Sequence, residues 1–110
     1  MILSNAEHAV IEPAKLTDYC LSPTHPVGRH KAAVFRAALG LTAADAPLLA
    51  DMLLRGAREQ PAELGRADVH GQRYQVDIPV ATTHGAAVVR TAWIIRADED
   101  FPRLVTCYVL

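Results

Sequence analysis

Two neighbouring strands of a β-sheet are predicted from the stretch RYQVDIPVATTHGAAVVRTAWIIR, residues 73–96. From Tyr74 to Ile78 apolar and polar side chains alternate, which is the period of a half-buried strand. Residues 83–85, Thr-His-Gly, have the composition of a turn. Residues 87–96 are apolar on both faces, and such strands lie in the interior of a sheet. The stretch therefore predicts a central part of an antiparallel sheet.

Three helical segments are predicted before these strands. Residues 15–21 give one or two turns, and residues 28–39 give a longer helix that Gly40 closes. Thr42 begins a third helix with a capping-box pattern, and Pro61 must end it. Residues at helical spacing mark an apolar stripe on each longer helix: Val27, Lys31, Val34, Phe35 and Ala38 on the second, and Leu48, Leu49, Met52 and Leu53 on the third.

Residues 104–110 predict a last strand, so helices precede strands along the chain. This order is typical of an α+β fold, with N-terminal helices packed on one face of a three- to four-stranded antiparallel sheet. We expect a single domain over residues 1–110. The apolar face should carry Tyr74, Val76, Ile78, Val89, Thr91, Trp93, Ile95, Val105, Cys107 and Val109. The more polar face should carry Arg73, Gln75, Asp77, Arg90, Ala92, Ile94, Arg96, Thr106 and Tyr108. A register shift of one residue would exchange the two faces.

The composition indicates a globular chain with an aliphatic core, because 51% of the residues are hydrophobic and only 5% are aromatic. No apolar run approaches the roughly 20 residues that cross a bilayer, and the first residues lack the features of an export signal. A formal net charge of -1 argues against a broad, non-specific nucleic-acid binder. Cys20 and Cys107 are free to pair in an exported protein, but in a cytoplasmic one we expect buried thiols.

The densest group of chemically active residues is SPTHPVGRHK, residues 22–31. His30 is a candidate for acid–base chemistry near neutral pH, and Lys31 for the stabilisation of negative charge. Residues 28–30 also begin a helix, where free backbone N–H groups can bind an anion such as phosphate. His25 either takes part in this chemistry or forms local hydrogen bonds that hold the loop.

Arg90 lies inside the best-defined strand, so its charge must be paired or must face an open surface. Arg90 either binds a phosphate or carboxylate through two parallel hydrogen bonds, or forms a structural pair with Asp77 across the sheet. Thr106 is a candidate for orienting a phosphate and Tyr108 for protonating a leaving oxygen, whereas the alternative for both is ordinary strand packing. No His pair has zinc-ligand spacing and no phosphate loop or dinucleotide motif is present, so no metal and no cofactor is expected.

Much of the chain resembles a small uncharacterised bacterial domain family. The resemblance is carried by YCLSPTHPVGRHKAAVF at residues 19–35, by AWIIR at residues 92–96 and by FPRLVTCYV at residues 101–109. The part HPxGxxKAxxF, residues 25–35, is also similar to domains at the ends of bacterial polymorphic toxins. Those domains are grouped with the barnase, EndoU, colicin and RelE-like ribonucleases.

This resemblance implies two N-terminal helices packed on a four-stranded antiparallel sheet. It also implies RNA cleavage without a metal ion, in which the neighbouring 2′-hydroxyl is the nucleophile. Carried onto this chain, it makes His30 the base or acid, and Lys31 and Arg90 the groups that stabilise the developing charge. Thr106 or Tyr108 supplies the remaining polar contact. The expected substrate-binding residues are His25, Gly28, Arg29 and Arg73.

The first functional hypothesis is therefore a cytoplasmic ribonuclease-like toxin that acts on RNA and is held inactive by a small antitoxin or immunity protein. The alternative is a non-enzymatic protein-binding module of the immunity or antitoxin type, with the polar sheet face as its interface. A third hypothesis is an enzyme acting on a small phosphorylated substrate. RNA cleavage, tight capture of one protein, or turnover of small nucleotides would distinguish the three.

Overall fold

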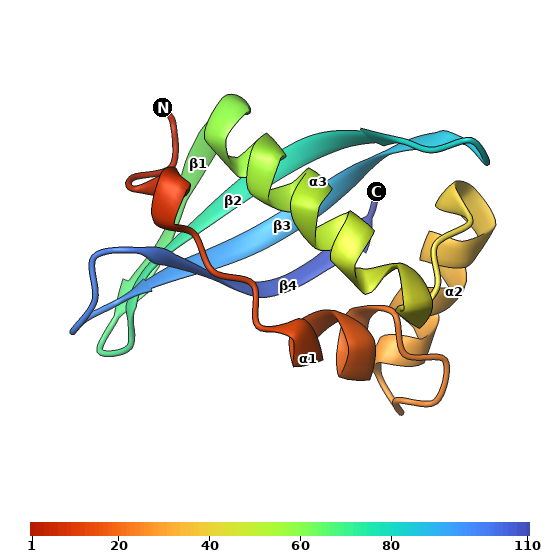
Figure 1. Cartoon of the computed structure of the whole chain (residues 1–110). Helices are drawn as coiled ribbons and strands as arrows, with labels where there is room; N and C mark the ends of the chain where they lie inside the picture. The colour runs from red at the N-terminus through yellow and green to blue at the C-terminus, as the bar shows by residue number, and fades with distance from the viewer.

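The computed structural model describes residues 1–110 and confirms the α+β fold. The main elements are α1 (Pro13–Lys15), α2 (Gly28–Leu39), α3 (Ala46–Glu59), β1 (Ala62–Asp68), β2 (Gly71–Ala81), β3 (Ala86–Arg96) and β4 (Pro102–Val109). Three short helical turns accompany them: η1 (Ala6–His8), η2 (Leu16–Cys20) and η3 (Ala43–Asp45). Figure 1 shows α3 lying across one face of the sheet, while α1 and α2 lie close to β4. The predicted order of helices before strands is correct.

The sheet is an antiparallel meander with the strand order β1-β2-β3-β4. Tyr74 pairs with Trp93 and Val76 pairs with Thr91, so the residues predicted to share the apolar face of the two central strands do share it. Trp93 is fully buried, as expected for a core residue, and its Nε1–H donates to Thr91 Oγ1 at 2.7 Å. The hydroxyl of Thr91 in turn donates to the Val76 carbonyl at 2.6 Å, so the buried polar atoms at the centre of the sheet are satisfied.

Strand β4 departs from the predicted alternation at one position. Ala92 pairs with Thr106, but the next residue of β3, Trp93, pairs with Leu104, so Val105 is an extra residue in β4. Leu104 is 3% exposed and takes the core position that simple alternation assigns to Val105. The prediction for Val105 is therefore wrong. A bulge shifts the alternation by one residue, and apolar residues on both sides of the bulge hide this shift in the sequence.

The fourth strand, β1, is absent from the residue pattern and is implied only by the family resemblance. Ala62 is its single buried residue, and the other positions of β1 are exposed. A strand at the edge of a sheet can be polar on both faces, so it lacks the alternation that marks a half-buried strand. Backbone pairing with β2, which joins Ala62 to Val76, is what defines it.

Helix α2 is found where it was predicted, closed by Gly40 in the left-handed conformation at a φ of 67°. Its apolar stripe is rotated, because Val27 and Val34 are 58% and 45% exposed. The buried positions are instead Gly28, Ala32, Phe35 and Leu39. Small residues face inwards because α2 packs closely on η2, and a Cβ at Gly28 would lie 2.1 Å from the Tyr19 carbonyl oxygen. The rotation leaves Lys31 half-buried on the flank of the helix.

The capping box predicted at Thr42 is present, but it begins the short turn η3, which leads into α3 at Ala46. Thr42 and Asp45 form a capping box, in which the Thr42 backbone N–H donates to Asp45 Oδ2 at 2.9 Å. Leu49 and Leu53 of α3 are fully buried and belong to the core, whereas Leu48, predicted in the same stripe, is half-exposed. The helix packs on β2 and so covers the apolar face of the sheet.

No single helix is long and apolar enough to cross a membrane, and only α2 and the η3–α3 segment taken together, bent by 75°, have the length and composition to do so.

Candidate active site

The ammonium group of Lys31 joins the helical layer to the sheet. Its Nζ donates to Thr106 Oγ1 at 2.8 Å and to Tyr19 Oη at 3.1 Å. No carboxylate lies within ion-pair distance of Lys31, since every ion pair of the molecule joins other residues. An ammonium has three N–H donors, and two of them are used by these hydroxyls. One donor therefore remains for a ligand, and no carboxylate compensates the positive charge.

Two aromatic rings complete the surroundings of this charge. Lys31 Nζ lies 4.6 Å from the centroid of the Tyr19 ring and 5.6 Å from that of Tyr108. Both distances are within the range in which a cation is attracted to an aromatic ring. The predicted residues Lys31, Thr106 and Tyr108 are thus brought together, and the chain adds Tyr19 to them.

A shallow cavity of about 340 Å³ lies against these groups. It is lined by His30, Lys31, Val34, Tyr108 and Val109. His30 is exposed and its imidazole makes no hydrogen bond within the protein, so both ring nitrogens are open to a ligand. A titratable imidazole, an unpaired ammonium and a phenol hence border one hollow, which is an arrangement suited to acid–base chemistry at an anionic group.

Arg90 forms a structural ion pair with Asp77. Of the two roles considered for Arg90, this is the one that does not involve a ligand. Its Nε donates to Asp77 Oδ1 at 2.9 Å and its Nη2 donates to Oδ2 at 3.0 Å. These hydrogen bonds are the main reason that the pKa of Arg90 is raised and that of Asp77 is lowered. Arg90 also pairs with Tyr108 across the β3–β4 ladder, and Tyr108 contributes to its raised pKa. The guanidinium is close to the cavity, but its charge is already compensated.

His25 holds the loop before α2 by local hydrogen bonds. Its Nδ1 accepts from the backbone N–H groups of Val27 at 3.0 Å and Gly28 at 2.9 Å. Its ring also packs edge-on against the Tyr19 ring, with the centroids 4.8 Å apart. Of the two roles considered for His25, the structure supports local capping, and through Tyr19 it positions the Lys31 ammonium.

The expected anion site at the start of α2 is not formed. The Gly28 amide is taken by His25, the Arg29 amide donates to the His25 carbonyl at 3.0 Å, and the His30 amide donates to the Val27 carbonyl at 3.4 Å. The prediction is wrong because the proline-containing loop folds back and satisfies these donors itself. Gly28 is required for close packing on Tyr19, and we assign it no contact with a ligand.

The remaining predicted substrate residues lie apart from this cavity. Arg73 forms an ion pair with Asp68, Nη1 to Oδ2 at 2.7 Å, and faces Ile94 across the sheet. It is four residues from Asp77 along β2, or about 13 Å at the rise of a strand. Arg29 is exposed and borders a different hollow on the other side of α2.

The two cysteines are far apart in sequence but adjacent in the fold. Both thiols are free and 0% exposed, as expected for buried thiols. Cys20 Sγ lies 3.7 Å from Thr106 Oγ1, and a hydrogen bond from Cys107 is the main cause that lowers the pKa of Cys20 to about 6. Hydrogen bonding to Cys20 and burial raise the pKa of Cys107. The pair supports Thr106 from the interior of the protein.

Tyr19 and Cys20 are the site residues that sequence reasoning missed. Tyr19 contacts the Lys31 ammonium and Cys20 contacts the Thr106 hydroxyl, so both act on the cavity through another residue. The signal that could have identified them is Gly28, because a glycine that begins a helix indicates close contact with a neighbouring segment. No group of three or more His, Cys, Asp or Glu side chains is placed to hold a metal ion.

Comparison with known families gives one match over nearly the whole chain. No curated protein shows significant sequence similarity to it. The match covers residues 2–110, and it bears out the resemblance to an uncharacterised domain family, whereas the likeness to polymorphic-toxin nucleases stays a prediction. With helices, sheet and cavity all inside the matched region, the chain belongs to the family described as Domain of unknown function (DUF6883).

Proposed function

We propose that this domain is a metal-independent ribonuclease whose active site is the cavity formed by His30, Lys31 and Tyr108. The observation that carries the proposal is the unpaired ammonium of Lys31, held by the Thr106 and Tyr19 hydroxyls at the cavity wall. Cleavage of a phosphodiester places extra negative charge on the oxygens of the phosphorus in the transition state. A fixed cation with a free N–H donor stabilises that charge.

The reaction is a transesterification within the RNA strand. The His30 imidazole takes the proton of a ribose 2′-hydroxyl, whose oxygen then bonds to the adjacent phosphorus. The bond from phosphorus to the 5′-oxygen of the next nucleotide breaks, and the Tyr108 hydroxyl donates a proton to that oxygen. The products are a 2′,3′-cyclic phosphate and a 5′-hydroxyl end. His30 and Tyr108 are the acid–base pair, and Lys31 is the charge stabiliser.

Thr106 and Arg90 have supporting roles in this proposal. The Thr106 hydroxyl accepts from Lys31 at 2.8 Å and so fixes the direction of the ammonium. Arg90, tied to Asp77 by two hydrogen bonds, lies against Tyr108 and orients the phenol; it no longer stands as a free charge stabiliser. Both are positioning residues.

The proposed enzyme acts in the cytoplasm, where its RNA substrate is, and a small antitoxin or immunity protein restrains it by covering the cavity. Such a partner also belongs to the second candidate, a non-enzymatic binding module. The observation that favours this second candidate is the apolar side chain of Val34, which lines the cavity and is 45% exposed, with Val27 and Leu110 also exposed close to lining residues in the chain. Exposed apolar groups that lie together mark docking surfaces.

Cleavage of total RNA by the purified protein, with and without a chelator, tests the proposal. We expect cleavage that survives the chelator, yields 2′,3′-cyclic phosphate ends and is lost in Lys31→Ala. Lys15→Ala is the matched control, because Lys15 is the other lysine of the chain and lies on α1 outside the cavity. Folding of each variant is checked by circular dichroism. RNA that stays intact, or cleavage that persists in folded Lys31→Ala protein, would refute the assignment.

A further inference from the structure

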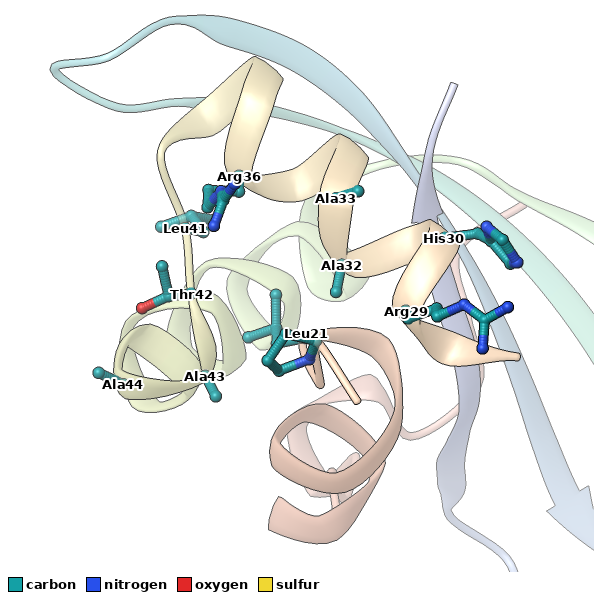
Figure 2. A pocket seen from close by; sticks show the side chains of 11 residues that line it. Leu21, Arg29, His30, Ala32, Ala33, Arg36, Leu41, Thr42, Ala43 and Ala44 are labelled. Atoms are coloured by element: carbon teal, nitrogen blue, oxygen red, sulfur yellow. The ribbon is translucent and has the colours of Figure 1, made fainter. Parts of the chain in front are cut away.

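A second cavity lies on the other side of α2 and is not used by the proposed reaction. Its volume is about 540 Å³, within the range of roughly 300–1,000 Å³ typical of small-molecule sites. Its floor is apolar and made of small or buried side chains, among them Leu21, Ala32 and Leu41. Figure 2 shows Ala32 directed toward Leu21, with the start of η3 forming the opposite wall.

The rim of this cavity is basic. Arg29, His30 and Arg36 line it, and no carboxylate does. Neither arginine forms an ion pair elsewhere in the molecule, and both are exposed. Figure 2 places Arg29 and Arg36 at opposite ends of the helix segment above the floor. Seven residues of α-helix separate them by about 10 Å. On a chain with a net charge of -1, two uncompensated guanidinium groups beside an apolar hollow select an anionic ligand with an apolar or planar body.

His30 connects this cavity to the active site, because this residue borders both hollows. A flexible ligand that crosses the first turn of α2 can therefore occupy both at once. Single-stranded RNA has the required chemistry: phosphates that pair with arginine, and unstacked bases that lie on apolar surface or on a guanidinium plane. A duplex offers no free base for the floor of the cavity.

We infer that the cavity between α2 and the start of α3 is a subsite for a nucleotide of single-stranded RNA next to the cleaved bond. Its phosphates pair with Arg29 and Arg36, and its base lies over the apolar floor. The inference rests on the proposed ribonuclease function, since it names the strand form of the same substrate and the surface that receives it.

The test uses a short single-stranded RNA with 2′-O-methyl riboses, which has no nucleophile and stays intact on the wild-type protein. Binding is measured as a function of salt concentration for wild type, Arg29→Ala and Arg36→Ala. Each arginine that neutralises one phosphate contributes about -0.7 to the slope of log K against log salt. We expect each variant to lose roughly that amount of slope and to bind about tenfold more weakly at low salt.

Two further variants separate the cavity from general electrostatics. Arg55→Ala removes the same charge from an exposed position of α3 outside both cavities and should bind like wild type. Ala33→Trp fills the cavity without changing the net charge and should weaken binding at least as much as Arg36→Ala. Circular dichroism confirms that each variant is folded.

The outcomes distinguish this inference from the function on which it rests. Wild-type binding in Arg36→Ala and Ala33→Trp, together with intact cleavage of natural RNA, would overturn the subsite and leave the ribonuclease assignment standing. A probe that wild type does not bind, together with no cleavage of natural RNA, would overturn both. The same variants are also measured with a duplex of the same RNA. If they lose as much affinity for the duplex as for the single strand, the arginines contact only the backbone, and the base-binding role of the cavity floor is overturned.

Discussion

Replacing Gly28 by alanine tests the close packing beside the proposed active site. In a helix, alanine is normally preferred over glycine by up to about 1 kcal/mol, so propensity alone predicts stabilisation. The structure predicts the opposite sign. The added Cβ would lie 2.1 Å from the Tyr19 carbonyl oxygen and 2.8 Å from its carbon, whereas ordinary contacts begin near 3.4 Å. The backbone of η2 must therefore move by more than 1 Å, which is the difference between 2.1 and 3.4 Å.

Such overpacking costs about 1–3 kcal/mol in well-packed proteins. For a domain of this size the loss corresponds to a melting temperature lower by roughly 5–20 °C. Displacement of Tyr19 also moves one of the two hydroxyls that hold Lys31, so the proposed RNA cleavage should slow in protein that is still folded. Thermal unfolding followed by circular dichroism measures the first effect, and a cleavage assay well below the midpoint measures the second.

Gly56→Ala is the comparison variant. There the added Cβ would lie 2.3 Å from Ile78 Cγ2, which is a side-chain atom, and a side chain can rotate where a backbone carbonyl cannot. We expect a smaller loss of stability than in Gly28→Ala and no specific loss of cleavage. A Gly28→Ala protein as stable as wild type, or more stable, would show that α2 and η2 are not packed as closely as described.

Three further predictions concern polar and charged side chains. The pKa of Glu99 is lowered chiefly by hydrogen bonds from Arg103. This pair therefore stabilises the fold at a pH above the pKa of Glu99 in the unfolded chain. The stabilisation is lost as the pH falls through the lower pKa of Glu99 in the folded protein. Glu99→Gln should thus lose stability at about pH 7 and little at about pH 2, measured by denaturant unfolding, and equal losses at both would contradict this account. A double-mutant cycle with Asp77→Asn and Arg90→Ala should give a coupling of about 0.2–1 kcal/mol, because both side chains are about one-third exposed, and a coupling of several kcal/mol would refute that estimate. His25→Ala should lower the free energy of unfolding by about 1 kcal/mol, since two backbone N–H groups lose their acceptor, and an unchanged thermal midpoint would count against the capping role.

The fold was largely predictable where the sequence carries a long, regular period. Residues 74–78 alternate strictly, and the continuous apolar run that follows the turn can only be a central strand, so the two faces of β2 and β3 were assigned correctly. The capping box at Thr42 is a local motif with its own hydrogen bonds, and it was also found. Periodicity fails where a tertiary contact decides. The bulge at Val105, the polar edge strand β1 and the rotation of α2 all depend on neighbours distant in sequence.

The site was predictable in its residue types but not in its connections. Lys31 is predicted from the start of the second helix, and Thr106 and Tyr108 from the last strand; the fold brings the three together beside one cavity. The sequence could not show that Arg90 forms its hydrogen bonds with Asp77. Until the strand register is known, Asp77 and an anionic ligand are equally good partners for this charge. It also could not show that His25 would take the amides at the start of α2, since that depends on how the proline-containing loop turns back.

The outer side of β4 is partly closed by the N-terminal segment. Val10 forms an isolated parallel bridge with Arg103; its N–H donates to the Pro102 carbonyl at 2.9 Å and its carbonyl accepts from Leu104 at 3.0 Å. A last strand with free backbone groups is a template for joining another molecule edge to edge, and this bridge removes part of that template. At the opposite border β1 discourages such joining with charged, exposed side chains and an irregular register. The protein thus protects its two sheet borders by different means, and β4, which contains Thr106 and Tyr108, also contacts α2 and η2.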